Sequence, residues 1–211
     1  MRWLTLVGVA AVVGGFLSYL AVPRSDAAVS AAAAPAVQSR SSADDKRIYL
    51  SPDQRREATG KAGFAIAPRS LLRVDRRLQY GEYEWNAEGV PPGPVTVRVD
   101  LRTQLMSVFR GGHEIGTTVA LYGADSKETP LGRFPILWKG KNHRSSLYDA
   151  PMPYTLRLTG DGVAIHGSNV RWGAATHGCV GVPTGFAEKL FAATKIGDVV
   201  TIVRTKNGTA S

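Results

Sequence analysis

Alternation of apolar and polar side chains with a period of two is the feature that most constrains the fold of this chain. In residues 95–101 every second position is Val or Leu, and the positions between them carry Thr, Arg and Asp. This pattern is typical of a β-strand with one buried face. Gly111-Gly112 and Thr159-Gly160-Asp161-Gly162 are turn signals of β-hairpins. Further strands are therefore expected at 105–109, 115–121, 133–138, 156–158, 163–165 and 199–203.

Within residues 95–204, one segment has the pattern of a good helix. Pro183 suits a first helical turn, and Phe186, Leu190 and Phe191 form an apolar stripe towards Lys195. Many strands with one helix packed on a sheet indicate a mainly β (α+β) domain. We expect a β-sandwich or a barrel-like fold with one packed helix.

The N-terminus, residues 1–26, reads as an export signal. An apolar run from Trp3 to Val22 follows Arg2. Twenty helical residues span about 30 Å, the thickness of one hydrocarbon core. This length favours an uncleaved membrane anchor, whereas the small residues around Ser25 resemble a signal-peptidase site. Both interpretations place the rest of the chain on the periplasmic or cell-wall side, and the anchored form would be associated with the inner membrane.

Composition divides the remainder of the chain. Residues 27–43 are mostly Ala, Ser, Pro and Val and are expected to be a linker. Residues 44–94 form an extension of unknown role, with a helix predicted from Ser51 to about Ala62, and we favour its packing on the main domain. The Pro-rich segment 90–94 marks the boundary of the predicted catalytic domain at 95–204, and 205–211 is a tail.

The charge of the chain fits a polyanionic neighbour but does not identify one. The net charge is +9, and residues 95–211 carry 14 basic and 8 acidic side chains, net +6. A nucleic-acid reader is conceivable on charge alone, but no recognition-helix, zinc or RNA-binding motif is present. An anionic wall polymer or membrane surface fits equally well, so no nucleic-acid partner is expected.

The chain contains a single cysteine, Cys179, in a Gly-rich segment with two histidines nearby. One cysteine excludes an intramolecular disulfide, and in an exported protein it suggests a free thiol or an intermolecular pair. A lone cysteine is by default a buried, inert residue, but Gly178 and Gly181 leave little bulk to bury it. A thiol with a histidine base is what acyl transfer through a thioester requires. Both His166 and His177 are candidates for the base.

Five segments, in this order along the chain, resemble landmarks of one known family. They are the paired strands of 95–109, Thr-Pro-Leu-Gly-Arg-Phe at 129–134, Ile-His-Gly-Ser at 165–168, Thr-His-Gly-Cys at 176–179 and Gly-Asp-Val-Val at 197–200. The family is that of the L,D-transpeptidase catalytic domain, whose members cross-link bacterial cell walls through a cysteine. The resemblance covers 95–204 and not 1–94. It implies the fold of that domain, a peptidoglycan stem peptide as substrate, no cofactor, and inhibition by carbapenems.

The resemblance also implies roles for the motif residues. Cys179 would be the nucleophile, and His166 the general base and then acid, its ring oriented by a backbone carbonyl near Gly167. His177 would be a supporting residue, and the backbone N–H groups of Gly178 and Cys179 would form the oxyanion hole. From the residues alone His177 could be the base, since side chains at i and i+2 in an extended segment point the same way.

Substrate contacts are expected in two segments. In the family the region 139–154 resembles a lid over the acyl-donor groove, which implies contacts from Arg144, Tyr148, Met152 and Tyr154. Arg171 and Trp172 lie in the short segment 167–175 between His166 and Thr176 and are the other candidates.

One departure concerns position 181. The family commonly has Arg or Asn two residues after the cysteine, and here that residue is Gly181.

Three other interpretations remain open at this point. Water instead of an amine could resolve the thioester, giving a carboxypeptidase or endopeptidase. The domain could be a non-catalytic wall-binding protein. Cys179, His166 and His177 could instead bind zinc, although they lack the usual paired-ligand spacing. A monomer is expected in each case.

Overall fold

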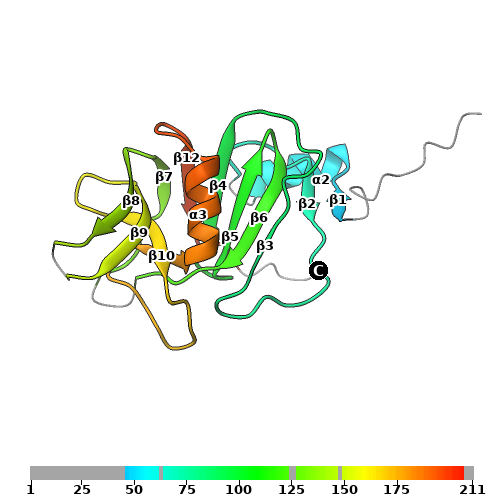
Figure 1. The fold of residues 1–211 in the computed structure, drawn as a ribbon. Coiled ribbons are helices and arrows are strands. Elements are labelled where there is room, and N and C mark those ends of the chain that lie inside the picture. The colour runs from blue at the N-terminus through cyan, green and yellow to red at the C-terminus, as the bar shows by residue number, and fades with distance from the viewer. Residues whose placement is uncertain (1–45, 62–63, 124–126, 147–148, 207–211) are drawn as a thin grey trace, which may run out of the picture. The chain divides into compact units, whose positions relative to one another are not determined.

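The computed structural model describes residues 46–61, 64–123, 127–146 and 149–206 (Figure 1). The strands and helices there are β1 (Arg47–Tyr49), α2 (Pro52–Lys61), β2 (Ser70–Leu72), β3 (Tyr83–Trp85), β4 (Val95–Asp100), β5 (Leu105–Arg110), β6 (His113–Val119), β7 (Gly132–Pro135), β8 (Trp138–Arg144), β9 (Pro151–Arg157), β10 (Ala164–Ser168), β11 (Val180–Pro183), α3 (Thr184–Ala193) and β12 (Val199–Val203). The predicted N-terminal membrane segment and the linker lie outside these residues. Among the described helices, none has both the length and the apolar character needed to cross a membrane.

The larger sheet has eight strands in the order β1-β2-β6-β5-β4-β12-β7, with β3 also paired to β6. Strands β4, β5 and β6 form an antiparallel meander, and β12 returns parallel to β4. The period-two pattern explains β4, because Val97 and Val99 are each 1% exposed while Thr96 and Arg98 between them are half-buried.

The smaller sheet has four strands in the order β11-β10-β9-β8. Strands β8, β9 and β10 are antiparallel neighbours, whereas β10 and β11 run parallel. The segment predicted as one strand at 133–138 is two strands, because β7 joins the larger sheet and β8 the smaller one. Ile136, between them, is buried in the core.

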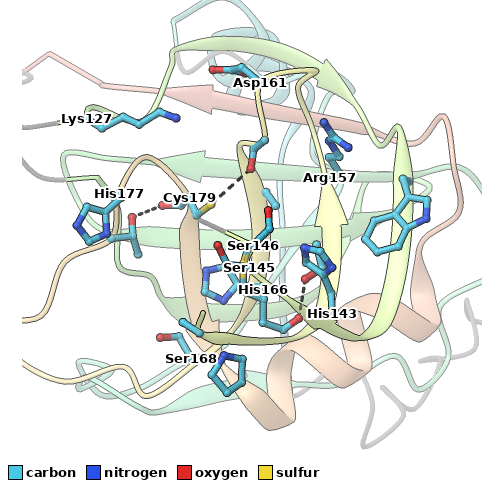
Figure 2. A pocket seen from close by; sticks show the side chains of 18 of the residues that line it. Lys127, His143, Ser145, Ser146, Arg157, Asp161, His166, Ser168, His177 and Cys179 are labelled. Carbon is cyan, nitrogen blue, oxygen red and sulfur yellow. Dashed lines mark hydrogen bonds between the residues drawn. The ribbon is translucent and has the colours of Figure 1, made fainter. Parts of the chain in front are cut away.

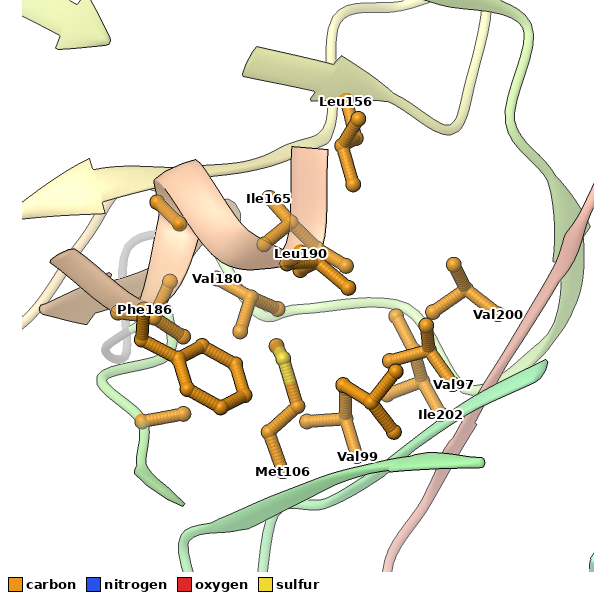
Figure 3. Packing of buried hydrophobic residues seen from close by; sticks show 14 of the residues in the cluster. Val97, Val99, Met106, Leu156, Ile165, Val180, Phe186, Leu190, Val200 and Ile202 are labelled. Carbon is orange, nitrogen blue, oxygen red and sulfur yellow. The ribbon is translucent and has the colours of Figure 1, made fainter. Parts of the chain in front are cut away.

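Helix α3 closes the core between the two sheets (Figures 1 and 3). It packs on β9 and β10 through Leu190, and the Phe186 ring meets Trp85 of β3 edge to face, 5.4 Å between centroids. The helix predicted over 183–195 forms over 184–193. It stops there because Thr194 is extended, and the Thr194 hydroxyl donates to the Leu190 carbonyl. Figure 3 shows Val97, Val99 and Met106 facing side chains of the smaller sheet.

The two sheets are separate and neither closes on itself, so the barrel form of the predicted fold is wrong. The mainly β architecture with a helix on a sheet is confirmed. A β-sandwich leaves sheet edges that a barrel would not. The last strands of the larger sheet are β1 and β7, and β8 ends the smaller sheet on one side. At the other end of the smaller sheet, Gly181 of β11 exchanges two backbone hydrogen bonds with Leu121, at 2.8 and 3.0 Å.

The extension 46–94 contributes strands to the larger sheet. β2 pairs with β6 parallel at one position and β3 pairs with β6 antiparallel. Arg47 of β1 is only 4% exposed, and its guanidinium donates to the carbonyls of Glu114 and Asn86, each at 2.6 Å. The extension is thus tied to β6 by strand pairing and by a buried cation.

Candidate active site

The pairing of β10 with β11 places His166 and Cys179 on one surface. Ile165 lies opposite Val180 in this parallel pair, and both side chains are fully buried in the core. Because side chains alternate between faces, His166 on β10 points to the other side, and so does Cys179, which directly precedes β11. Burial of Ile165 and Val180 thus fixes β10 and β11 in the core, and the strand alternation turns His166 and Cys179 towards the opposite surface.

A cavity of about 830 Å³ opens on that surface (Figure 2). Its walls come from β8, β9, β10, the turn at 159–162 and the segment that leads into β11. Among the predicted site residues, those that line it are Cys179, His166, His177 and Met152. Other lining residues had no predicted role, among them Lys127, His143, Arg157, Asp161 and Ser168.

The His166 ring is fixed by its own strand. Its Nδ1 lies 2.9 Å from the carbonyl oxygen of Gly167, the contact that the predicted orienting role requires. A carbonyl only accepts, so Nδ1 carries the proton and Nε2 is left as a base. Burial lowers the pKa of His166, with a smaller lowering contribution from His143. The ring is therefore neutral at neutral pH, as a general base must be.

Burial shifts the Cys179 thiol in the opposite direction. It raises the pKa of Cys179, and this outweighs the Ala164 backbone N–H and the Lys127 charge, which favour the thiolate. The sulfur lies 3.8 Å from the carbonyl oxygen of Gly162, to which the thiol donates. Cys179 is thus a protonated thiol that needs a base before it can attack a carbonyl.

Two threonine hydroxyls fix the backbone at the cysteine. The Cys179 carbonyl accepts from Thr176 at 2.5 Å and from Thr129 at 3.5 Å. Thr129 also accepts from the backbone N–H of Gly123 at 2.9 Å. The Thr176 hydrogen bond is local, since it joins residues three positions apart. The role of Thr129, in the Thr-Pro segment, was not predicted because it bonds to a residue 50 positions away.

The backbone at Gly178 packs closely against the backbone at Gly123, and both positions require glycine. Gly178 has φ +95°, a conformation that side chains disfavour. A Cβ on Gly123 would lie 2.8 Å from the Gly178 Cα. The backbone that carries the predicted oxyanion donors, Gly178 and Cys179, therefore packs directly against Gly123 and Lys127. Their role in oxyanion binding remains a prediction.

The two histidines differ in their surroundings. His177 is exposed, and Figure 2 shows its ring pointing away from the Cys179 sulfur. His166 is half-buried and faces the pocket. This difference favours His166 as the base and gives His177 a place at the rim.

The predicted substrate contacts are not all brought together. Met152 is 9% exposed and lines the pocket. Arg144 ends β8 and pairs with Asp149 at 2.5 Å, outside the residues that line it. Tyr148 lies outside the described residues.

Tyr154, Arg171 and Trp172 do not line the pocket. The Tyr154 hydroxyl donates to Glu188 of α3 at 2.8 Å, so this side chain is turned towards the helix. Trp172 is 81% exposed and meets Tyr80 of the extension edge to face, 5.5 Å between ring centroids. Arg171 is also exposed, and neither it nor Trp172 lines the pocket.

A larger residue at position 181 would require Ser168 to shift by a few tenths of an ångström. A Cβ on Gly181 would lie 3.1 Å from the Ser168 Cβ and 3.5 Å from the Thr176 methyl. Ser168 lines the pocket and lies next to the place that a Cβ at position 181 would take. It is two residues after His166 on one strand, so the period of two could have predicted its position beside the base.

The zinc interpretation finds no geometric support. Across the part of the chain that the structure describes, no three His, Cys, Asp or Glu side chains are grouped so that they could hold a metal ion. Cys179, His166 and His177 are therefore not arranged as a ligand set.

Comparison with known proteins identifies the domain. The family model of the YkuD L,D-transpeptidase catalytic domain matches residues 94–202. This chain belongs to the L,D-transpeptidase catalytic domain family. The match begins at Pro94, one residue before β4, and ends within β12.

Solved structures of L,D-transpeptidases are similar over part of their length. A Stackebrandtia nassauensis enzyme is 27% identical, with 56% of this chain and 60% of that chain covered and a TM-score of 0.49. Mycobacterium tuberculosis L,D-transpeptidase 1 is 24% identical, with coverages of 52% and 62% and a TM-score of 0.47. An Enterococcus faecium C442S mutant is 23% identical, with coverages of 53% and 50% and a TM-score of 0.48. The chain thus matches less than two thirds of each of these structures. A comparison with curated proteins finds no match.

Proposed function

We propose that this L,D-transpeptidase family member transfers the acyl group of a peptidoglycan stem peptide to an amine through a thioester on Cys179. One observation supports the proposal above the others. The β10–β11 pair presents a neutral His166 and a protonated Cys179 to the same pocket, in a domain of this family.

The reaction follows from these protonation states. His166 Nε2 takes the thiol proton as the Cys179 sulfur attacks the scissile carbonyl, and negative charge forms on the carbonyl oxygen. The backbone N–H groups of Gly178 and Cys179 stabilise that oxyanion. The C–N bond then breaks, and the departing amine takes the proton from the imidazolium, which leaves a thioester. An acceptor amine attacks the thioester with His166 again as base, and the thiol is restored.

The surroundings of the pair suit this sequence of proton transfers. Burial disfavours charge on both groups, so proton transfer is coupled to attack instead of preceding it. The Gly167 carbonyl holds the tautomer with a free Nε2. The threonine bonds to the Cys179 carbonyl limit movement of the nucleophile.

Intact-protein mass spectrometry with a stem tetrapeptide and, separately, a carbapenem tests the proposal. We expect an acyl adduct on the wild type, none on the Cys179→Ala protein, and cross-linked product from the tetrapeptide. An adduct with trimmed peptide alone would show that water resolves the thioester, making the protein a hydrolase of the same fold. A folded protein with no adduct would favour the wall-binding interpretation.

A further inference from the structure

The loop of residues 169–179, which we call the connecting loop, joins the strand of the base to β11. Ala174 and Ala175 of this loop line a second cavity, of about 310 Å³. The other residues of its lining are Gln104, Tyr122, Gly123, Glu128 and Arg204. Ala175 also lines the active-site pocket, so the loop is bordered by both cavities. The position of the loop at these two residues is therefore not set by a packed core.

The end of the connecting loop next to the nucleophile is fixed by Thr176. Its backbone N–H donates to the Tyr122 carbonyl at 3.0 Å. Its hydroxyl donates to the Cys179 carbonyl at 2.5 Å. A shift of the loop at Thr176 therefore moves the backbone that carries the nucleophile.

The first half of the connecting loop contains a turn that contacts the extension. The Ala174 N–H donates to the Arg171 carbonyl at 3.2 Å, and Gly173 has φ +75°. These features define a β-turn with Trp172 at its tip. The Trp172 indole meets the Tyr80 ring edge to face, 5.5 Å between centroids.

Tyr80 is itself fixed to the larger sheet. Its hydroxyl donates to Gln104 Oε1 at 2.7 Å, in the turn between β4 and β5. Two residues further along the extension, the Glu82 carbonyl accepts from the Thr118 hydroxyl of β6 at 2.8 Å. The ring that touches Trp172 is thus anchored at its hydroxyl and through the neighbouring backbone.

We propose that Tyr80 is a positioning residue that holds the connecting loop through Trp172 and so keeps Cys179 in place for attack. The inference deepens the proposed function, on which its catalytic readout rests. Trp172 is 81% exposed, so its indole fills no core and its contact with Tyr80 serves to hold the turn. Without that contact the loop can shift into the cavities beside it, which exposes the thiol. Tyr80 does not line the pocket and takes no part in proton transfer.

Alkylation of Cys179 by iodoacetamide, followed by intact mass, reports the position of the loop without any substrate. Tyr80→Ala should raise the alkylation rate at about pH 7 roughly 2- to 10-fold, the effect expected when an aromatic pair is lost. Trp172→Ala should raise it equally, and the double variant no further, because both changes break one contact. Tyr80→Phe keeps the ring and should stay near the wild-type rate. Single variants at or below the wild-type rate, or a double variant showing the product of two increases, would overturn the inference.

Tyr49→Ala is the matched control. Tyr49 lies on β1 of the same extension, is 56% exposed, and meets the His113 ring, 6.4 Å between centroids. Neither side chain lines the pocket. This variant should be alkylated at the wild-type rate. An increase like that of Tyr80→Ala would show that any change in the extension loosens the site, contrary to the inference.

Acylation by a stem tetrapeptide separates this inference from the proposed function. Tyr80→Ala and Trp172→Ala should each lower kcat about 10-fold with little change in KM, because the nucleophile is misplaced while the substrate contacts remain. A raised KM with an unchanged kcat for Trp172→Ala would make the indole a substrate contact and overturn the inference. A wild type that is not acylated, with the expected alkylation pattern, would overturn the proposed function and support the positioning role.

Discussion

At the scale of single residues, the division of roles between the two histidines is the point most open to test. His166→Ala should lower kcat/KM at least ~10²-fold, the usual size of a lost general base. His177→Ala should cost much less, because its ring is exposed and points away from the sulfur. Both proteins should unfold at the wild-type temperature. A larger loss for His177→Ala would mean that the base is assigned to the wrong residue.

The pH dependence of thiol reactivity distinguishes a neutral pair from an ion pair. Burial disfavours the charged form of each group, so the pKa of Cys179 is raised and the pKa of His166 is lowered. Alkylation by iodoacetamide should therefore keep rising with pH from about 6 to beyond about 9, the region above the ordinary thiol pKa. Acylation should instead gain its full rate once the pH exceeds the lowered pKa of His166. An alkylation plateau near neutral pH would show a preformed thiolate, contrary to these shifts.

At the scale of elements, the backbone around Cys179 depends on two segments packed without side chains between them. A Cβ on Gly123 would lie 2.1 Å from the Lys127 carbonyl oxygen and 2.8 Å from Gly178. Gly123→Ala should displace the segment that carries Cys179 and lower the acylation rate about 10²-fold, as for a misplaced catalytic group. Gly160→Ala is the matched control, since nothing lies within 4 Å of its Cβ, and it should keep its rate. Similar rates for both variants would show that this packing does not position the nucleophile.

The elements also show where sequence patterns predict structure. Strand β4 was predictable because one of its faces is buried, which imposes a period of two. Strand β8 was missed because Lys139, Lys141 and Asn142 leave it polar and exposed along most of its length, so no alternation marks it. Strand β9 was predicted only at its end, in the segment 156–158. The positions of His166 and Cys179 were predictable from local motifs. Lys127 and Thr129 were not, because their contacts with the 176–179 segment are set by the tertiary fold.

At the scale of the whole described unit, the buried Arg47 is expected to hold the extension on the larger sheet. Arg47→Met would leave the Glu114 and Asn86 carbonyls without their charged donor. The free energy of unfolding should fall by about 2 kcal/mol or more, because each unsatisfied buried group costs about 1–3 kcal/mol. Denaturant unfolding measures this, with Lys46→Met, whose side chain is 62% exposed, as the control. Equal stability of the two variants would show that strand pairing alone holds the extension.

The contact between Tyr80 and Trp172 bears on how much of the chain is needed to support the candidate site. Trp172 lies in the short segment that joins the base to the nucleophile motif, and Tyr80 lies before the first residue of the family match. Nearby, Gly81 fits against the Val170 carbonyl, 3.3 Å from the place of its Cβ. The segment shared with the family is thus shorter than the segment that supports the site. A fragment that began at Val95 would keep every motif of the family but would lose Tyr80 and Gly81, which contact the segment between His166 and Cys179. The boundary of the family match, at residue 94, therefore differs from the boundary of the folded unit, whose first strand begins at Arg47.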